Sequence, residues 1–478
     1  MAFNSLQFVL FFVIVYILYL ASGLKWQNKI LLAASYVFYA FWDWRFLSII
    51  LVSTLFNYYG GLKIDEVDRD SERKKFLILS VCLNLGLLGF FKYYDFFAGS
   101  LQTLLWSFGW RISKVTLNIV LPLGISFYTF QAMSYPIDIY RRVIKPTRHF
   151  LDFALFVAFF PQLVAGPIER ARNMLPQIQS KRHITLDQFY TGCWLIFWGL
   201  FKKIVVADNL AKVAGRVFGA QGAFTGIETL IATYAFVFQI YADFSGYSDM
   251  ARGLARLMGF NIMINFRVPF FASNLYDFWQ RWHISLTTWI KEYLFYPLAL
   301  AKFLGRQLKP YSVVIITWAI MGFWHGPAGK FILWGVYHGV LIVLFSKIRP
   351  YLKLIRPQNR LLAGSLLTGQ ILTVFHLFCI GILFFAAEST AQAFGALYSI
   401  FFNFKIGHLY TMHMPTLAAI SMCIFPMMLI EYFQYRTNDE MVVFRWPAPV
   451  RGLVYYVILY LIIFYGDFGA QKYYYFQF

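Results

Sequence analysis

Charged residues are scarce in this chain. Aspartate, glutamate, lysine and arginine make up 13% of its 478 residues, whereas hydrophobic residues make up 60%. Soluble globular domains contain about 25% charged and about 45–50% apolar residues. The shortage of charge therefore excludes a mainly soluble protein and predicts an integral membrane protein.

Cysteine is also scarce, and the common metal and serine-hydrolase patterns are missing. The chain has four cysteines without metal-ligand spacing, in or beside apolar stretches that favour a packing role, namely Cys82, Cys193, Cys379 and Cys423. No His-x-x-x-His pair occurs, so we predict no metal site. Ser245 precedes a glycine in the run DFSGYSD, but the first glycine of a Gly-x-Ser-x-Gly elbow is absent, which argues against a Ser-His-Asp hydrolase.

Long apolar runs, in contrast, recur along the whole chain. They cover residues 6–20, 30–42, 46–59, 76–91, 117–139, 150–164, 195–206, 227–240, 313–323, 331–345, 361–385, 416–430 and 453–465. Several are shorter than the roughly 20 residues of a straight membrane-spanning helix, so some are predicted to be re-entrant or broken. The first run has no basic residue before it and no small-x-small cleavage site, which predicts a retained span. We predict an all-α polytopic membrane protein with one membrane-embedded domain over residues 1–478, including an aromatic tail at 467–478.

The net charge of +20 is spread over short loops instead of one nucleic-acid-binding patch. Basic residues cluster at 63–75, 141–148, 347–360 and 436–451. Basic loops stay on the cytoplasmic side of a membrane. Counting spans from these loops places the N-terminus and the C-terminal tail outside the cytoplasm, so we predict a multi-pass protein of the cell (inner) membrane whose partner is the lipid bilayer and not nucleic acid.

Polar residues interrupt the apolar pattern in four stretches, 122–142, 159–171, 241–260 and 278–339. Ionisable groups at membrane depth are costly, and each is therefore a functional hypothesis.

The eight histidines differ in their surroundings. His149 and His183 lie in basic loops, His408 and His413 lie in an expected outer loop, and His376 stands alone in an apolar span, which favours a packing role. His283 and His325 each follow a tryptophan within an apolar segment, and His338 lies close enough in sequence to support His325. A buried histidine that stays neutral can accept a proton from a hydroxyl, which suits acyl transfer.

At these residues the sequence resembles the membrane-bound O-acyltransferases. The segments QRWHISLTTW and MGFWHG are similar to the two histidine-bearing signatures of that family. Four further segments resemble the bacterial branch of that family that O-acetylates polysaccharides such as alginate. They are LPLGISFYTFQAMSYPIDIYR, FFPQLVAGPIER, YADFSGYSDMARGLARLMGF and the ending YYYFQF. The resemblance covers nearly the whole chain in the same order. It implies about a dozen spanning and re-entrant helices around a central tunnel, with His325 as the catalytic residue and His283 in either a chemical or a structural role.

The chain departs from that branch after its first histidine signature. Related subunits read Arg-Asp-Tyr-Leu-Tyr followed by a Pro-Leu-Gly-Gly-Asn-like turn. This chain has Lys291 and Glu292 at the charged places and Ala299 and Ala301 where the glycines stand. The departure concerns the acceptor polymer or the partner more than the chemistry.

Further residues are predicted to contact substrate or to line the tunnel. They are Trp282, Trp324, Asp243, Ser245, Asp249 and Gln131, with Tyr247, Glu169 and Arg170 as weaker candidates. A structural alternative stays open for Asp243 and Asp249, because either carboxylate can pair with Arg252 or Arg256.

The branch implies an acyl group that crosses the membrane. Its donor is a cytoplasmic thioester, acetyl-CoA or an acylated carrier protein, and no cofactor is bound permanently. Neither donor can cross, so a small group must be acylated in the tunnel. A tyrosine hydroxyl, with a pKa of about 10, lies between a thiol at about 8.5 and a sugar alcohol, so it can accept an acyl group and pass it on.

Tyr475 takes the place of the branch's terminal tyrosine. From Asp467 to Tyr475 the extended chain spans at most about 26 Å, whereas half of the hydrocarbon core is about 15 Å. Gly466 and Gly469 provide a flexible turn. We therefore expect Tyr475 to accept the acyl group and a separate extracytoplasmic acetyltransferase to receive it. The alternatives are an aromatic belt at the membrane surface, D-alanyl or other acyl transfer to a cell-envelope polymer, and a transporter or flippase without covalent acylation.

Overall fold

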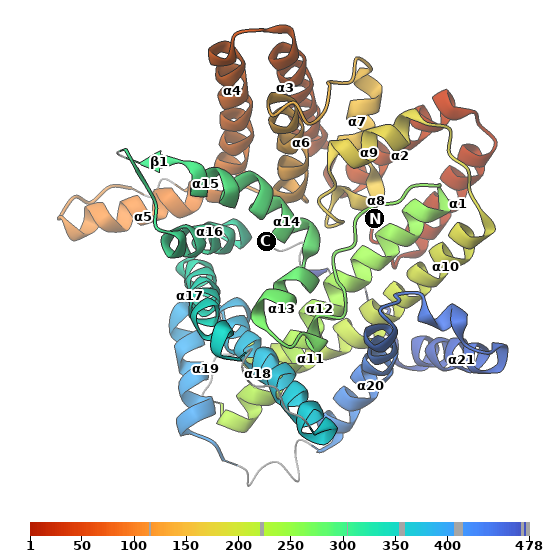
Figure 1. Cartoon of the computed structure of the whole chain (residues 1–478), viewed down its shortest axis with the longest axis vertical. Coiled ribbons are helices and arrows are strands. Elements are labelled where there is room, and N and C mark those ends of the chain that lie inside the picture. The colour runs from red at the N-terminus through yellow and green to blue at the C-terminus, as the bar shows by residue number, and fades with distance from the viewer. Residues whose placement is uncertain are drawn as a thin grey trace. The chain divides into compact units, whose positions relative to one another are not determined.

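The structure is a computed structural model that describes residues 1–113, 116–219, 224–303, 305–352, 359–405, 414–469 and 473–474. His408, His413 and Tyr475 lie outside these residues. Helices make up nearly all of the regular structure (Figure 1). The sheet in the described part is one antiparallel hairpin, β1 (Lys302–Phe303) and β2 (Arg306–Gln307). The predicted all-α class is confirmed.

The chain forms two compact units. The first contains Met1–Ile196 and Ser248–Met263, and the second contains Phe197–Tyr247 and Ile264–Tyr474. The long helix α12 (Gly226–Leu257) contributes its first part to the second unit and its last part to the first. The prediction of one membrane-embedded domain over the whole chain stays a prediction.

The first unit is built from short and medium helices. They are α1 (Leu6–Leu20), α2 (Leu24–Asp43), η1 (Trp44–Phe46), α3 (Leu47–Glu66), α4 (Asp70–Leu88), η2 (Gly89–Tyr93), α5 (Tyr94–Ser107), α6 (Ile125–Tyr140), α7 (Phe150–Ala158), α8 (Phe160–Leu163), α9 (Ala171–Gln179) and most of α10 (Leu186–Phe201).

The second unit carries the longer C-terminal helices. Its elements are η3 (Lys202–Ala207), α11 (Asp208–Phe218), η4 (Pro269–Phe271), α13 (Leu275–Arg281), α14 (Ile284–Ile290), η5 (Lys291–Phe295), α15 (Tyr296–Leu300), α16 (Pro310–His325), α17 (Gly329–Leu352), α18 (Arg360–Ala386), α19 (Thr390–Phe402), α20 (Met414–Thr437), η7 (Val442–Arg445) and α21 (Ala448–Tyr465).

Seven helical stretches in the described part of the chain are long and apolar enough to cross a membrane. They are Leu24–Glu66, Asp70–Ser107, Leu186–Phe218, Gly329–Leu352, Arg360–Ala386, Thr416–Thr437 and Ala448–Tyr465. The multi-pass prediction is therefore confirmed. The central tunnel and the side of the membrane that each loop occupies stay predictions.

Two predicted apolar runs are interrupted for local reasons. The run 117–139 becomes helical only at Ile125, because Gly124 adopts a left-handed conformation with φ 75° and ends the preceding loop. The run 150–164 breaks at Phe159 between α7 and α8, where ψ is 109°. The short apolar runs predicted that some helices are broken, but not at which residues these two breaks lie.

Helices α3, α4 and α6 pack side by side in the first unit (Figure 1). Asn57 of α3 and Asn84 of α4 exchange amide hydrogen bonds of 3.1 and 2.9 Å inside this group. Each side-chain amide thus supplies a hydrogen-bond partner for the other in a buried position, as polar residues do between helices in membranes.

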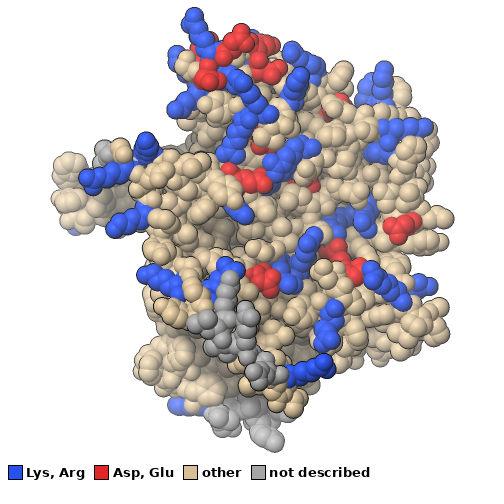
Figure 2. All heavy atoms as spheres, in the orientation of Figure 1, with Lys and Arg blue, Asp and Glu red and all other residues tan. Residues whose placement is uncertain are grey.

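The loop between α3 and α4 exposes both signs of charge, as the top of Figure 2 shows. Lys63 pairs with Glu66 at 2.9 Å, and Arg69 pairs with Glu72 at 3.8 Å. Because lysine and arginine dominate the topology rule and acidic residues contribute little, the cytoplasmic assignment of this loop stays a prediction.

Candidate functional site

The predicted site residues fall in both units. The second unit holds Asp243, Ser245, Trp282, His283, Trp324 and His325, and the first holds Gln131 and Asp249. Tyr475 lies outside the described residues, whereas the two residues before it are described.

His325 is the last residue of α16, directly before Gly326. Its imidazole is 4% exposed and lies among aromatic rings. The ring centroids of Trp324, Trp334 and Phe385 lie 4.9, 5.2 and 5.1 Å from the centroid of the imidazole. The imidazole is therefore held in place by rings from three helices.

Glycines bring the backbones of α16 and α17 together beneath His325. A Cβ atom at Gly322 would lie 2.1 Å from the carbonyl oxygen of Phe331, and one at Gly335 would lie 2.1 Å from the carbonyl oxygen of Trp318. Small residues at such a crossing let membrane helices approach closely. The spacing of α16 and α17 sets the position of both His325 and Trp334.

Substituting Gly335 by alanine is expected to lower thermal stability. The added methyl group meets a backbone oxygen, so the two helices must separate, and such overpacking costs about 1–3 kcal/mol. Gly329→Ala on the same helix is the matched control, because nothing lies within 4 Å of a Cβ there. Thermal unfolding in detergent measures the difference, and equal unfolding temperatures for the two variants would contradict this account.

His283 adopts a left-handed backbone conformation, with φ 45° and ψ 53°, immediately before α14. A side chain in this region costs free energy, and such strain persists only where the surroundings impose it. Asn265 supplies the restraint, because its carbonyl oxygen accepts from the Ile284 N–H at 2.9 Å and its Oδ1 accepts from the Ser285 hydroxyl at 2.6 Å.

The two signature histidines share one tryptophan neighbour. The centroid of the Trp324 ring lies 6.5 Å from that of His283 and 4.9 Å from that of His325. Burial lowers the pKa of the His283 imidazole to about 3, so this ring is neutral at pH 7. The structure thus brings both histidines and Trp324 together, and the choice between a chemical and a structural role for His283 stays open.

Trp282 is packed among aromatic rings. Its ring lies 5.1 Å from Phe266, 5.7 Å from Phe278 and 4.8 Å from Phe378 between centroids, and its side chain is buried. These contacts support α13, and a substrate contact for Trp282 stays a prediction.

Asp243 lies in a buried ionic cluster with Lys203 and Asp208. Lys203 Nζ is 2.7 Å from Asp208 Oδ1 and 2.8 Å from Asp243 Oδ1. The other carboxylate oxygen of Asp243 accepts from the backbone N–H of Tyr474 at 2.8 Å. Asp243 therefore pairs with a lysine and not with the arginines that sequence reasoning proposed, and it contacts the C-terminal tail.

Lys203, which pairs with the predicted site residue Asp243, was not named by the sequence analysis. It lies inside the apolar run 195–206, where a lysine is costly and therefore a functional signal. The cost is offset by two carboxylates, and this pairing could not be read from the sequence because Asp243 is 40 residues away.

Of the remaining predicted residues, one is buried without a hydrogen-bond partner among the described residues, and the others form an ion pair or hydrogen bonds. Ser245 is buried, and its hydroxyl has no hydrogen-bond partner among the described residues. Asp249 pairs with Arg252 at 3.5 Å, one of the two pairings expected for it, and its contact with substrate stays a prediction. The Gln131 side-chain amide donates to the Phe156 carbonyl, and Glu169 accepts from the Met263 N–H at 2.8 Å. Asp249, Gln131 and Glu169 thus brace the first unit.

His338 and His325 both contact the ring of Trp334. The centroid of the His338 ring is 5.0 Å from those of Trp279 and Trp334, and neither ring nitrogen has a hydrogen-bond partner among the described residues. A Cβ atom at Gly381 would lie 2.5 Å from His338 Nε2, so the glycine makes room for the imidazole. His338 thus supports Trp334, which in turn contacts His325.

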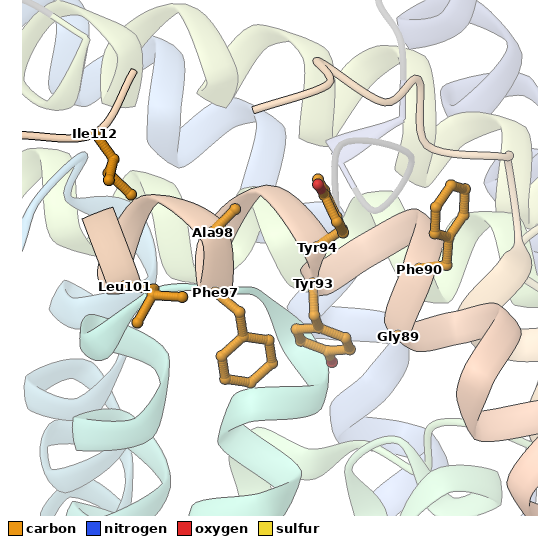
Figure 3. Close-up of a pocket in the computed structure, with 8 residues that line it drawn as sticks. All are labelled: Gly89, Phe90, Tyr93, Tyr94, Phe97, Ala98, Leu101 and Ile112. Carbon is orange, nitrogen blue, oxygen red and sulfur yellow. The ribbon is translucent and has the colours of Figure 1, made fainter. Parts of the chain in front are cut away.

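An apolar cavity of about 530 Å³ lies elsewhere, in the first unit (Figure 3). It is lined by Gly89, Phe90, Tyr93, Tyr94, Phe97, Ala98, Leu101 and Ile112. None of the predicted site residues lines it, and its wall is mainly apolar, with Tyr93 and Tyr94 as the residues that carry hydroxyl groups.

Comparison with known proteins gives one consistent result. Residues 39–386 match the family model described as "MBOAT, membrane-bound O-acyltransferase family". The chain is 39% identical over 408 residues to a probable alginate O-acetylase AlgI of Azotobacter vinelandii, covering 84% of this chain and 78% of that protein. It is 38% identical over 341 residues to a peptidoglycan O-acetyltransferase of Helicobacter pylori, covering 65% of this chain and 63% of that protein. A teichoic acid D-alanyltransferase of Bacillus subtilis is 28% identical over 282 residues, covering 57% of this chain and 70% of that protein.

Proposed function

The chain belongs to the membrane-bound O-acyltransferase family, and from that premise we propose that it passes an acetyl group through Tyr475 to an extracytoplasmic polysaccharide. It is a multi-pass membrane O-acyltransferase. Acetyl is favoured over D-alanyl, because the O-acetyltransferase relatives are 38–39% identical and the D-alanyltransferase only 28%. The donor is a cytoplasmic thioester, either acetyl-CoA or an acylated carrier protein.

One observation carries this proposal. Tyr473 and Tyr474 pack inside the second unit, where Tyr473 is 1% exposed and the Tyr474 hydroxyl lies 3.5 Å from the carbonyl oxygen of Phe385. The ring of Phe385 lies 5.1 Å from that of His325. The residue directly before Tyr475 is therefore separated from His325 by a single aromatic residue. An aromatic belt at the membrane surface does not account for the burial of Tyr473.

The proposed reaction balances as two acyl transfers. His325 takes the phenol proton of Tyr475, the phenol oxygen attacks the thioester carbonyl, and the carbon–sulfur bond breaks. The thiol leaves with that proton, and an acetyl ester of tyrosine remains. A separate extracytoplasmic acetyltransferase then passes the acetyl group to a polysaccharide hydroxyl and regenerates the phenol. This scheme places the C-terminus outside the cytoplasm and the protein in the cell (inner) membrane.

Incubation of the purified protein with isotope-labelled acetyl-CoA is expected to place one acetyl group on the peptide that contains residues 473–478. Mass spectrometry with fragmentation assigns the modified tyrosine. A parallel incubation with an acetylated acyl carrier protein identifies the donor, and D-alanyl donors test the runner-up activity. If the peptide stays unlabelled with every thioester donor, the tyrosine carrier is wrong.

A further inference from the structure

Residues around the π-helical segment η3 hold the tail at two points. We propose that Lys203, Ile204 and Asp243 form a tail latch, which fixes the register of the C-terminal arm and so presents the residue after Tyr474 to the acyl-transfer site. The proposal rests on the function proposed above and adds the residues that position its intramolecular substrate.

The first point of attachment is where the tail begins. The Asp467 N–H donates to the Ile204 carbonyl oxygen at 2.9 Å, and Lys212 Nζ lies 3.0 Å from Asp467 Oδ2. Ile204 belongs to η3, where π-helical bonding changes the backbone register and where functional sites often occur. The side-chain amide of Asn209 also donates to the Tyr465 carbonyl oxygen at 2.8 Å. The start of the tail is therefore tied to the π segment by its backbone.

The second point of attachment is the ring of Tyr473. Lys203 Nζ lies 4.3 Å from the ring centroid, within the range of a cation–π contact. The ring of Tyr247 packs on Tyr473 edge to face at 5.2 Å. Because such contacts strengthen when the cation is desolvated, the buried Lys203 binds this ring more firmly than a surface lysine would.

The charges of the cluster explain why Asp243 binds the tail backbone. Two carboxylates, Asp208 and Asp243, face the single ammonium group of Lys203. Buried carboxylates need donors for their remaining oxygen atoms. The Tyr474 N–H provides one at 2.8 Å to Asp243 Oδ2. A backbone donor is present whatever the side chain, so this bond fixes the position of the chain and not the identity of residue 474.

A close helix contact brings Lys203 to Asp243. A Cβ atom at Gly246, one turn after Asp243 on α12, would lie 2.7 Å from the carbonyl oxygen of Gly199 and 3.2 Å from Cβ of Lys202. The missing side chain lets α12 lie directly against the end of α10 and the start of η3. The latch therefore depends on local backbone geometry as well as on charge.

Hydrogen exchange at the Tyr474 amide tests the latch without any acyl donor. In Asp243→Ala, exchange of the peptide containing residues 473–478 is expected to accelerate about tenfold or more, because its charged acceptor is gone. Asp243→Asn is expected to restore most of the protection, since the amide oxygen still accepts. Asp208→Asn is the matched control, because Asp208 pairs with Lys203 but makes no hydrogen bond to the described residues of the tail. It leaves one carboxylate against one ammonium group, and exchange should stay within about twofold of wild type.

Tyr475 acetylation supplies the second measurement. In Asp243→Ala the maximal rate of labelling is expected to fall about tenfold, while the donor concentration for half-maximal rate is unchanged, because the tail and not the donor is displaced. Wild-type exchange rates in Asp243→Ala would overturn the latch even if Tyr475 is labelled. Conversely, altered exchange in Asp243→Ala with no labelling of wild type would leave the latch standing and refute the tyrosine carrier.

Discussion

Replacing His325 by alanine is expected to reduce tyrosine acetylation by about 10²–10⁴-fold, the range that a general base contributes. The reason is that the His325 ring lies 5.1 Å from that of Phe385, whose carbonyl oxygen lies 3.5 Å from the Tyr474 hydroxyl. The measurement is the initial rate of isotope incorporation from a thioester donor into the peptide that contains residues 473–478.

Two further variants separate chemistry from packing. His325→Gln retains bulk between Trp334 and Phe385 but cannot take up a proton at neutral pH, so it should be as inactive as alanine while unfolding at the wild-type temperature. His376→Ala is the matched histidine control, because His376 is exposed and its Nε2 lies 2.8 Å from the Tyr234 hydroxyl. It should keep wild-type activity. Labelling at the wild-type rate in His325→Gln would exclude His325 as the base.

The sequence predicted the helical class and the pair of histidines, each for a physical reason. Sixty per cent hydrophobic residues, arranged in long repeated runs, are typical of membrane-spanning helices. His283 and His325 were found by motif, and the structure places both beside Trp324. That shared contact depends on how α16 packs against the segment before α14. No period or spacing in the sequence encodes such packing.

The helix breaks and the buried ion pairs were not predicted from the sequence, because they depend on local backbone conformation and on charges that are far apart in the chain. Helices α5 and α19 were missed because polar residues interrupt their apolar faces. The break at Phe159 depends on a single backbone angle. Lys203 and Asp243 lie on separate helices, and their pairing follows from the close approach at Gly246. Chain length allowed Tyr475 to reach inward, which stays a prediction, whereas the bonds of Asp467 to Ile204 and of Tyr474 to Asp243 required the structure.

Replacing Tyr475 by phenylalanine is expected to remove tyrosine acetylation completely and to lower polysaccharide acetylation in cells to the level of a strain without the gene. The change deletes one oxygen atom and keeps the aromatic ring, so the latch on Tyr473 and Tyr474 should survive. Retained protection of the tail in hydrogen exchange would show that the arm is still in place. The loss would then be chemical, because a phenyl ring offers no nucleophile for the thioester carbonyl.

The neighbouring tyrosine provides the matched control for this loss. The Tyr474 hydroxyl lies 3.5 Å from the Phe385 carbonyl oxygen, at the limit of a hydrogen bond, so Tyr474→Phe should keep most of the wild-type rate. Equal losses in Tyr474→Phe and Tyr475→Phe would point to the packing of the aromatic tail as the cause. Polysaccharide acetylation that persists in Tyr475→Phe would mean that the acetyl group crosses the membrane without this hydroxyl. If polysaccharide acetylation is lost in Tyr475→Phe but not in Tyr474→Phe, the phenol oxygen of Tyr475 is what the active enzyme has and the inactive one lacks. Such a result is expected if Tyr475 carries the acetyl group covalently, and not if it only anchors the tail.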